Sequence, residues 1–216
     1  MATFVLIHGG IQGGWVWERV SAHLHDAGHK TYAPTLTGCG ELSHLLTRDV
    51  GLESHVQDVV NLLEYEDLHD VILVGHSYGA IVVTVVADRA HDRIAHLVIV
   101  DGAQPLPGQS MMDLWISGDP QGAEEFDRYV QETGEGWRVI PMDPREFGVT
   151  DEADIRWLGD LGLLGTSKRA GVQRYDFVQR LPDGLIRSCT HGNQQIKITV
   201  RSQATIECRT IQVYGL

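Results

Sequence analysis

The sequence predicts an α/β fold in which a mostly parallel sheet lies between two layers of helices. Short apolar runs occur at residues 3–7, 71–74 and 94–100, as expected for strands that are buried on both faces of a parallel sheet. Amphipathic helical segments separate these runs, and strands that alternate with helices are typical of doubly wound sheets. With 216 residues, of which 43% are hydrophobic, the chain is long enough for a sizeable core. We therefore expect a single domain over residues 1–216.

The other elements of this sheet domain follow from apolar spacing and from residues that end helices. Residues 15–27 have the spacing of a helix, and Gly28 follows as a plausible C-cap. A short strand is expected at 30–34, followed by a loop at 35–48. The segment 52–65 again places its apolar residues on one helical face, which predicts a second amphipathic helix.

Residues 105–160 differ in composition from the segments before them. Short helical stretches at 111–116, 122–132 and 152–158 are separated by turns rich in proline and glycine. This pattern predicts a helical cap over the carboxyl ends of the strands, where ligands of such sheets bind. Trp137 lies in this segment and is a candidate for an apolar contact with a substrate.

A sequence Gly-His-Ser-Tyr-Gly occupies residues 75–79, directly between the apolar run 71–74 and the small, β-branched residues 80–87. A strand that turns sharply into a helix at this motif holds its serine at a strained backbone angle, and glycine is needed on either side. The helix then begins directly beneath the serine, so that its dipole faces any negative charge that forms there. We predict that Ser77 is a nucleophile.

A second motif, His-Gly-Gly at residues 8–10, follows the first apolar run. Attack by Ser77 on a carbonyl group creates an oxyanion, which needs two N–H donors already in place. Tyr78 is expected to supply one from the start of its helix, and Gly10 the other from the loop that His8 orients. The neighbours of these donors in the two motifs are candidates for contacts with substrate: Gly9 and His76.

Composition excludes several classes of function. The net charge of −12 argues against a nucleic-acid partner, and no apolar run is long enough to span a bilayer. The amino terminus has no signal-peptide pattern, and the three cysteines lack the spacing of metal ligands. We therefore expect a cytoplasmic protein without a metal site that acts on a small molecule.

Several short segments match one known group of enzymes. They read Phe-Val-Leu-Ile-His-Gly-Gly at 4–10, Gly-Gly-Trp-Val-Trp at 13–17, Ala-Pro-Thr-Leu-Thr-Gly at 33–38, Glu-Ser-His-Val at 53–56, Gly-His-Ser-Tyr-Gly at 75–79 and Leu-Val-Ile-Val-Asp at 97–101. Two cap segments, at 137–141 and 147–151, also match bacterial members. From residue 2 to about residue 160 the chain resembles the α/β-hydrolase superfamily, and within it the branch of plant methylesterases, hydroxynitrile lyases and small bacterial esterases.

This resemblance implies a three-layer α/β-hydrolase fold with a helical cap and a serine hydrolase that cleaves carboxylic esters without a cofactor. It also implies a catalytic triad in the chain order serine, acid, histidine. The lyases of this branch carry threonine where this chain has Gly9, so lyase activity is not expected. Dehalogenases carry aspartate at the position of Ser77, which excludes that reaction. A thioesterase or acyltransferase would use the same triad and stays open.

The resemblance ends where the charge changes sign. Residues 1–160 carry 26 acidic against 9 basic side chains, whereas residues 161–216 carry 3 against 8. The two family strands that would deliver the triad acid and base are not recognisable in this last segment. A truncated or frameshifted ending explains these observations better than a divergent one.

His191 is the only histidine after the cap, so it is the candidate base if the base follows Ser77 in the chain. Asp101, at the end of the strand 94–100, is the candidate acid, with Asp183 in a Pro-Asp-Gly turn as the alternative. A serine without a base is a poor nucleophile. The alternative function is therefore an impaired hydrolase-fold protein that binds small apolar carbonyl compounds without turnover.

Overall fold

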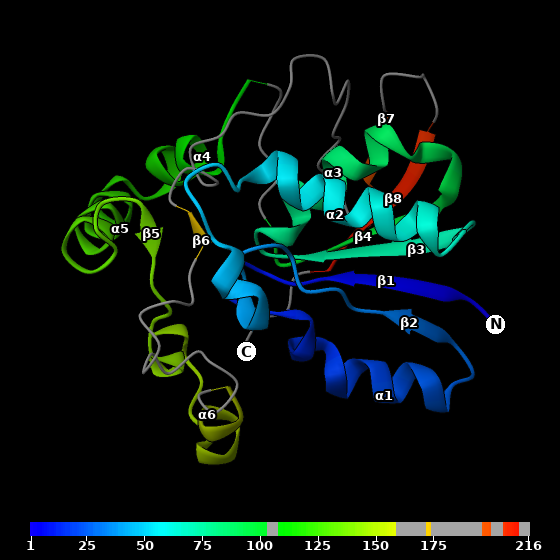
Figure 1. Ribbon diagram of the computed structural model, residues 1–216, viewed down its shortest axis with the longest axis horizontal. Helices are drawn as coiled ribbons and strands as arrows, with labels where there is room; N and C mark the ends of the chain where they lie inside the picture. The colour runs from blue at the N-terminus through cyan, green and yellow to red at the C-terminus, as the bar shows by residue number, and fades with distance from the viewer. Residues whose placement is uncertain (103–107, 159–171, 174–195, 200–204, 212–216) are drawn as a thin grey trace.

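A six-stranded sheet forms the centre of the computed structural model, which describes residues 1–102, 108–158, 172–173, 196–199 and 205–211 (Figure 1). Its strands lie in the order β2-β1-β3-β4-β8-β7. They comprise β1 (Thr3–Ile7), β2 (Lys30–Tyr32), β3 (Val71–His76), β4 (Ile94–Val100), β7 (Ile196–Thr199) and β8 (Thr205–Ile211). All neighbours are parallel except β7 and β8, which are antiparallel. The predicted mostly parallel sheet is confirmed.

The register of the central strands brings their carboxyl ends together at one edge of the sheet. Ile7 of β1 lies opposite Gly75 of β3, and His76 of β3 lies opposite Val100 of β4. The residues that follow these strands therefore leave the sheet side by side. This edge carries both motifs singled out in the sequence.

Helices cover both faces of the sheet (Figure 1). The 3₁₀ helix η1 (Gly14–Trp17) and α1 (Glu18–Asp26) lie on one face, and α2 (Leu52–Tyr65) and α3 (Gly79–Arg89) lie on the other. Alternate residues of β1 pack on the two faces of the sheet, because successive side chains along a strand point to opposite sides. Val5 packs in the core that includes α2 and α3, whereas Leu6 packs with Trp17.

Helix α3 is buried around almost its whole circumference, from Gly79 to Ala87. A helix that is apolar on all sides needs partners on all sides, and α3 contacts β3 on the sheet and α2 outside it. The helix that begins at the serine motif is therefore the most enclosed helix of the described fold. Among the described residues, no helix is both long enough and apolar enough to cross a bilayer.

A cap segment, residues 111–158, lies beyond the carboxyl ends of β1 and β3 (Figure 1). It contains α4 (Met111–Gly118), α5 (Pro120–Thr133), β5 (Arg138–Val139), the 3₁₀ helix η4 (Pro144–Phe147) and α6 (Glu152–Leu158). The three helices occur where the sequence predicted them. Strand β5 pairs with β6 (Val172–Gln173), an antiparallel contact that the sequence pattern did not predict.

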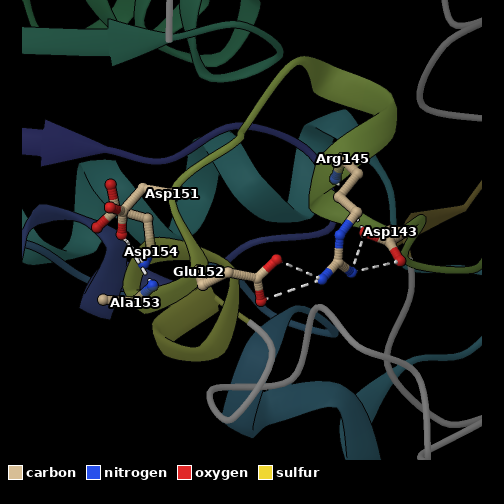
Figure 2. Close-up of polar contacts among 6 residues, drawn as sticks. All are labelled: Asp143, Arg145, Asp151, Glu152, Ala153 and Asp154. Carbon is tan, nitrogen blue, oxygen red and sulfur yellow. Dashed lines mark hydrogen bonds and ion pairs between the residues drawn. The ribbon is translucent and has the colours of Figure 1, made fainter.

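Polar contacts fix the last part of the cap segment (Figure 2). Asp151 accepts hydrogen bonds from the backbone N–H groups of Ala153 and Asp154, which caps the start of α6. Arg145 joins Asp143 to Glu152 and so connects η4 to α6.

Helix α6 packs against η1 and α1. The Trp157 ring meets the Trp15 ring edge to face, with centroids 5.8 Å apart, and Arg19 lies 4.3 Å above the Trp157 ring. Arg19 also forms an ion pair with Asp154 at 2.7 Å. These contacts hold the end of the cap segment against the helices that follow β1.

Some local predictions were wrong. The helix predicted at 15–27 is divided into η1 and α1, and the apolar residue Val20 of α1 is 42% exposed. The predicted loop at 35–48 contains a 3₁₀ helix, η2 (Gly40–Leu45), and a further short one, η3 (His91–Arg93), precedes β4. Strands β8 and β7 extend the sheet beside β4, although no strand of the sheet was predicted from the sequence after residue 160.

Candidate active site

The strand-to-helix turn at Ser77 has the strained geometry that the motif predicted. Ser77 has a φ of 50°, in the left-handed region that non-glycine residues seldom adopt. Such a residue costs about 1–3 kcal/mol and persists only where its surroundings hold it. Here its N–H donates to the carbonyl of Val100 at 3.2 Å, and its carbonyl accepts from the N–H of Ala80 at 3.0 Å. The side chain is half-buried, so it stays within reach of a ligand.

The glycines of the motif are required by close backbone approach. A Cβ atom on Gly75 would lie 2.5 Å from the carbonyl oxygen of Gly79. A Cβ atom on Gly79 would lie 2.6 Å from the carbonyl oxygen of His8, on the neighbouring chain segment. Both glycines therefore let α3 begin directly against the ends of β3 and β1.

The loop after β1 lies against Ser77. A Cβ atom added to Gly9 would lie 3.2 Å from the Cβ of Ser77 and 3.0 Å from Nδ1 of His76. The N–H of Gly9 donates to the side chain of Gln12 at 3.0 Å, whereas no described residue accepts a hydrogen bond from the N–H of Gly10. Tyr78, on the other side of Ser77, is the N-cap residue of α3, at the positive end of the helix dipole. The predicted neighbours Gly9, Gly10, His76, Ser77 and Tyr78 are thus brought together.

His8 orients this loop, as predicted. The N–H of Leu36 donates to Nε2 of His8 at 3.0 Å, so Nε2 carries no proton, and Nδ1 must donate to the carbonyl of Gly9 at 2.7 Å. The side chain is fully buried. Burial lowers the pKa of His8 from 6.5 to about 4, which keeps the ring neutral.

This buried imidazole makes the stability of the protein depend on pH. The unfolded chain takes up a proton near pH 6.5, but the folded chain does so only near pH 4. Acidification from about pH 7.5 to about pH 4 should therefore lower the free energy of unfolding by about 3 kcal/mol through His8 alone. His55 and His76, whose pKa values burial also lowers, add to the fall. Urea unfolding at both pH values measures it.

His8→Gln is the matched comparison for this measurement, because glutamine does not titrate. The variant should be less stable at neutral pH, since the bond from Leu36 is disturbed, but its stability should fall less on acidification. An equal fall in both proteins would show that His8 is not the responsible group.

Asp101 follows β4 and also has a positive φ, of 43°. Its neighbour Gly102 abuts the serine turn, because a Cβ atom there would lie 2.3 Å from the Cβ of Ala80. The Asp101 carboxylate is exposed, and no described residue hydrogen-bonds to it. Burial lowers the pKa of His76, and the negative charge of Asp101 raises it in part. Asp101 is thus near the serine turn, but no described histidine forms a hydrogen bond with its carboxylate.

The remaining predicted site residues are Trp137, His191 and Asp183. Trp137 is half-buried in the turn before β5, and its ring contacts are with the guanidinium groups of Arg48, at 4.8 Å, and Arg138, at 5.5 Å. No ring or polar contact among the described residues joins Trp137 to Ser77. His191 and the alternative acid Asp183 lie outside the described residues.

One residue at this site was not singled out from the sequence. His55 of α2 forms a hydrogen bond with the Tyr78 hydroxyl at 2.8 Å, and both side chains are buried. The signal was available, because His55 shares a helical face with the apolar residues Val59 and Leu63. A histidine on the buried face of a helix needs hydrogen-bond partners. Within the described ranges, no His, Cys, Asp or Glu side chains are grouped as a set of metal ligands.

Several known proteins are similar to this chain in sequence or in structure. A carbendazim hydrolyzing esterase from Nocardioides sp. (strain SG-4G) is 49% identical over 114 residues, which are 53% of this chain and 47% of the relative. Methylesterase 8 from Arabidopsis thaliana is 32% identical over 103 residues, which are 47% of this chain and 38% of the relative. The chain thus spans about half or less of the length of these curated relatives.

A solved structure matches over a larger part. It is an extracellular alpha/beta-hydrolase from a Paenibacillus species, described as sharing structural and functional homology with tobacco salicylic acid binding protein 2. Its TM-score is 0.71 at 25% identity, over 84% of this chain and 71% of that one. The profile of the alpha/beta hydrolase fold matches residues 2–140. The predicted resemblance is confirmed, and the chain belongs to the alpha/beta hydrolase fold family.

Proposed function

We propose that the protein hydrolyses small carboxylic esters through an acyl-enzyme on Ser77. The observation that supports this most strongly is the position of Ser77, which has a φ of 50° in front of α3 and contacts the Gly9–Gly10 loop. A serine in a strained turn with N–H donors on both sides suits attack on a carbonyl group, because the donors meet the charge that forms.

In the proposed reaction the Ser77 oxygen attacks the ester carbonyl while a base takes its proton. The carbonyl oxygen becomes negatively charged and accepts hydrogen bonds from the backbone N–H groups of Gly10 and Tyr78. Collapse of this intermediate expels the alcohol, which receives the proton from the base. Water then attacks the acyl-enzyme in the same way, which releases the acid and restores Ser77.

We propose His191 as the base and Asp101 as the group that orients it. The triad order of the family requires a histidine after Ser77 and after the acid, and His191 is the only histidine that follows the cap segment. His191→Ala should therefore reduce kcat/KM for an ester by about 10³-fold or more. His96→Ala is the control, because His96 is exposed on β4. Equal turnover by the wild type and His191→Ala would remove His191 from the mechanism.

The names of the relatives suggest which esters to try. We propose a small neutral ester as substrate, and the first compounds to test are p-nitrophenyl acetate, simple methyl esters and carbendazim. Release of alcohol and acid in equal amounts would support ester hydrolysis. Absence of turnover for every ester tested, by folded protein, would contradict it.

The sequence after the cap segment supports the second function, binding of small carbonyl compounds without turnover. The family strands that would deliver the triad acid and base are not recognisable in residues 161–216. A protein of this kind would bind an ester or ketone with a measurable heat of binding and release no product. Isothermal titration with a non-hydrolysable ketone, run beside the turnover assay, separates the two functions.

A further inference from the structure

We propose that His55 is a positioning residue that holds Tyr78, and through it the oxyanion site beside Ser77, against the segment Leu36–Thr37. The inference rests on the proposed function, because it concerns the same site. It begins with a buried link between three parts of the chain. His55 Nδ1 lies 2.8 Å from the Tyr78 hydroxyl, and His55 Nε2 lies 2.9 Å from the carbonyl oxygen of Thr37.

The direction of both hydrogen bonds follows from the partners. A carbonyl oxygen only accepts, so Nε2 of His55 carries the proton that it donates to Thr37. In the neutral ring Nδ1 is then an acceptor, and the Tyr78 hydroxyl donates to it. Burial lowers the pKa of His55 and so favours the neutral ring. His55 and Tyr78 are each only 1% exposed, and the hydrogen bond between them is buried.

The far end of this link is itself fixed. Asp58, on the same helix as His55, accepts hydrogen bonds from the Thr37 N–H at 2.7 Å and from the Thr37 hydroxyl at 3.0 Å. The position of Thr37 relative to α2 is therefore determined by three hydrogen bonds. Tyr78 is thus joined through His55 to Thr37, which Asp58 also holds to α2.

The other half of the oxyanion site is attached to the same support. The N–H of Leu36, the residue before Thr37, donates to His8, which in turn donates to the carbonyl of Gly9. One buried imidazole thus connects the Leu36–Thr37 segment to the loop of Gly10, and a second connects it to Tyr78. The two N–H donors come from different elements, and this shared support sets their separation.

A purely structural role explains this pair poorly. An apolar residue at position 55 and a phenylalanine at position 78 would fill a similar volume, and replacing both partners of a buried hydrogen bond is often nearly neutral for stability. The hydrogen bond between His55 and Tyr78 instead fixes the direction and distance of Tyr78 relative to α2. Oxyanion donors must lie about 2.7–3.1 Å from the developing charge, and loss of one donor costs about 10²–10³-fold in kcat. Displacement of a donor that is still present should reduce kcat by a smaller factor than its loss.

Tyr78→Phe tests the inference, because it removes only the hydroxyl. We expect kcat for an ester to fall about 10-fold per titrated active site, with KM changed by less than about 2-fold, because the donor acts on the transition state more than on the bound ester. Affinity for a boronate, which imitates the tetrahedral intermediate, should fall by the same factor. Thr84→Val is the matched control, since it removes a buried hydroxyl from α3 whose one hydrogen bond within the described residues is to the carbonyl of Ala80, at 2.7 Å.

A double-mutant cycle makes the result specific to the pair. His55→Leu should lower kcat like Tyr78→Phe, and the double variant should be no worse than either single one. If His55→Leu does not fold, the comparison of Tyr78→Phe with Thr84→Val tests the positioning role by itself. Unchanged kcat and boronate affinity in folded Tyr78→Phe, with active wild type, would overturn the positioning role alone. A wild type that neither turns over esters nor reacts with a fluorophosphonate would overturn the proposed function and the positioning role together.

Discussion

Replacing Ser77 with alanine is expected to reduce ester turnover by about 10⁴-fold or more, because the acyl-enzyme can no longer form. The residual rate should be that of oxyanion stabilisation and binding alone. The fold should be little affected, since no described residue forms a hydrogen bond with the Ser77 hydroxyl that the substitution removes. Initial rates with p-nitrophenyl acetate, at matched protein concentration, measure the difference.

The control for this variant is a serine outside the site. Ser117 of α4 is exposed, and among the described residues its hydroxyl donates to the carbonyl of Leu114 alone, at 2.8 Å. Ser117→Ala should keep full activity. If Ser77→Ala kept the wild-type rate, another nucleophile or contaminating esterase would have to account for the turnover, and the proposed mechanism would fail.

Gly79→Ala should produce the largest loss of stability among the single substitutions considered. Its Cβ atom would lie 2.6 Å from the carbonyl oxygen of His8 and 2.7 Å from that of Ile7, and backbone atoms cannot rotate away. The start of α3 and the end of β1 must separate, which should cost about 3 kcal/mol. Because this movement also separates Ser77 from the Gly9–Gly10 loop, activity should fall as well. Urea unfolding measures the first effect.

Gly118→Ala provides the comparison, because a Cβ atom there meets no other atom within 4 Å. Alanine favours a helix by up to about 1 kcal/mol over glycine, so this variant of α4 should be as stable as the wild type or slightly more stable. Equal stability of the Gly79 and Gly118 variants would contradict the close packing of the serine turn.

The parts of the fold that could be predicted are those with a strong periodic signal. The strand 94–100 and the helix 52–65 occur with the bounds expected, because a continuous apolar run and a clear apolar face leave little choice. The division at Glu18 between η1 and α1 could not be predicted, since 3₁₀ and α turns have similar apolar spacing over a few residues. The pairing of β8 with β4 depends on contacts distant in sequence, which no local pattern contains.

The candidate active site likewise has parts that could be predicted from the sequence and parts that could not. The motif at 75–79 predicted the strained Ser77, since its two glycines leave room for helix and strand to meet closely at this turn. The bond between His55 and Tyr78 depends on how α2 lies over α3, which the sequence leaves open. Trp137 was chosen for its aromatic ring in the cap segment, and its partners Arg48 and Arg138 emerge only from the fold.

Reaction with a fluorophosphonate, followed by mass spectrometry of the digested protein, tests the central claim most directly, because the probe reacts only with an activated serine. We predict one adduct per chain, on the peptide that contains Ser77, formed rapidly by the wild type and absent in Ser77→Ala. No adduct on folded wild-type protein, or an adduct on a different serine, would contradict the proposal that Ser77 is the nucleophile.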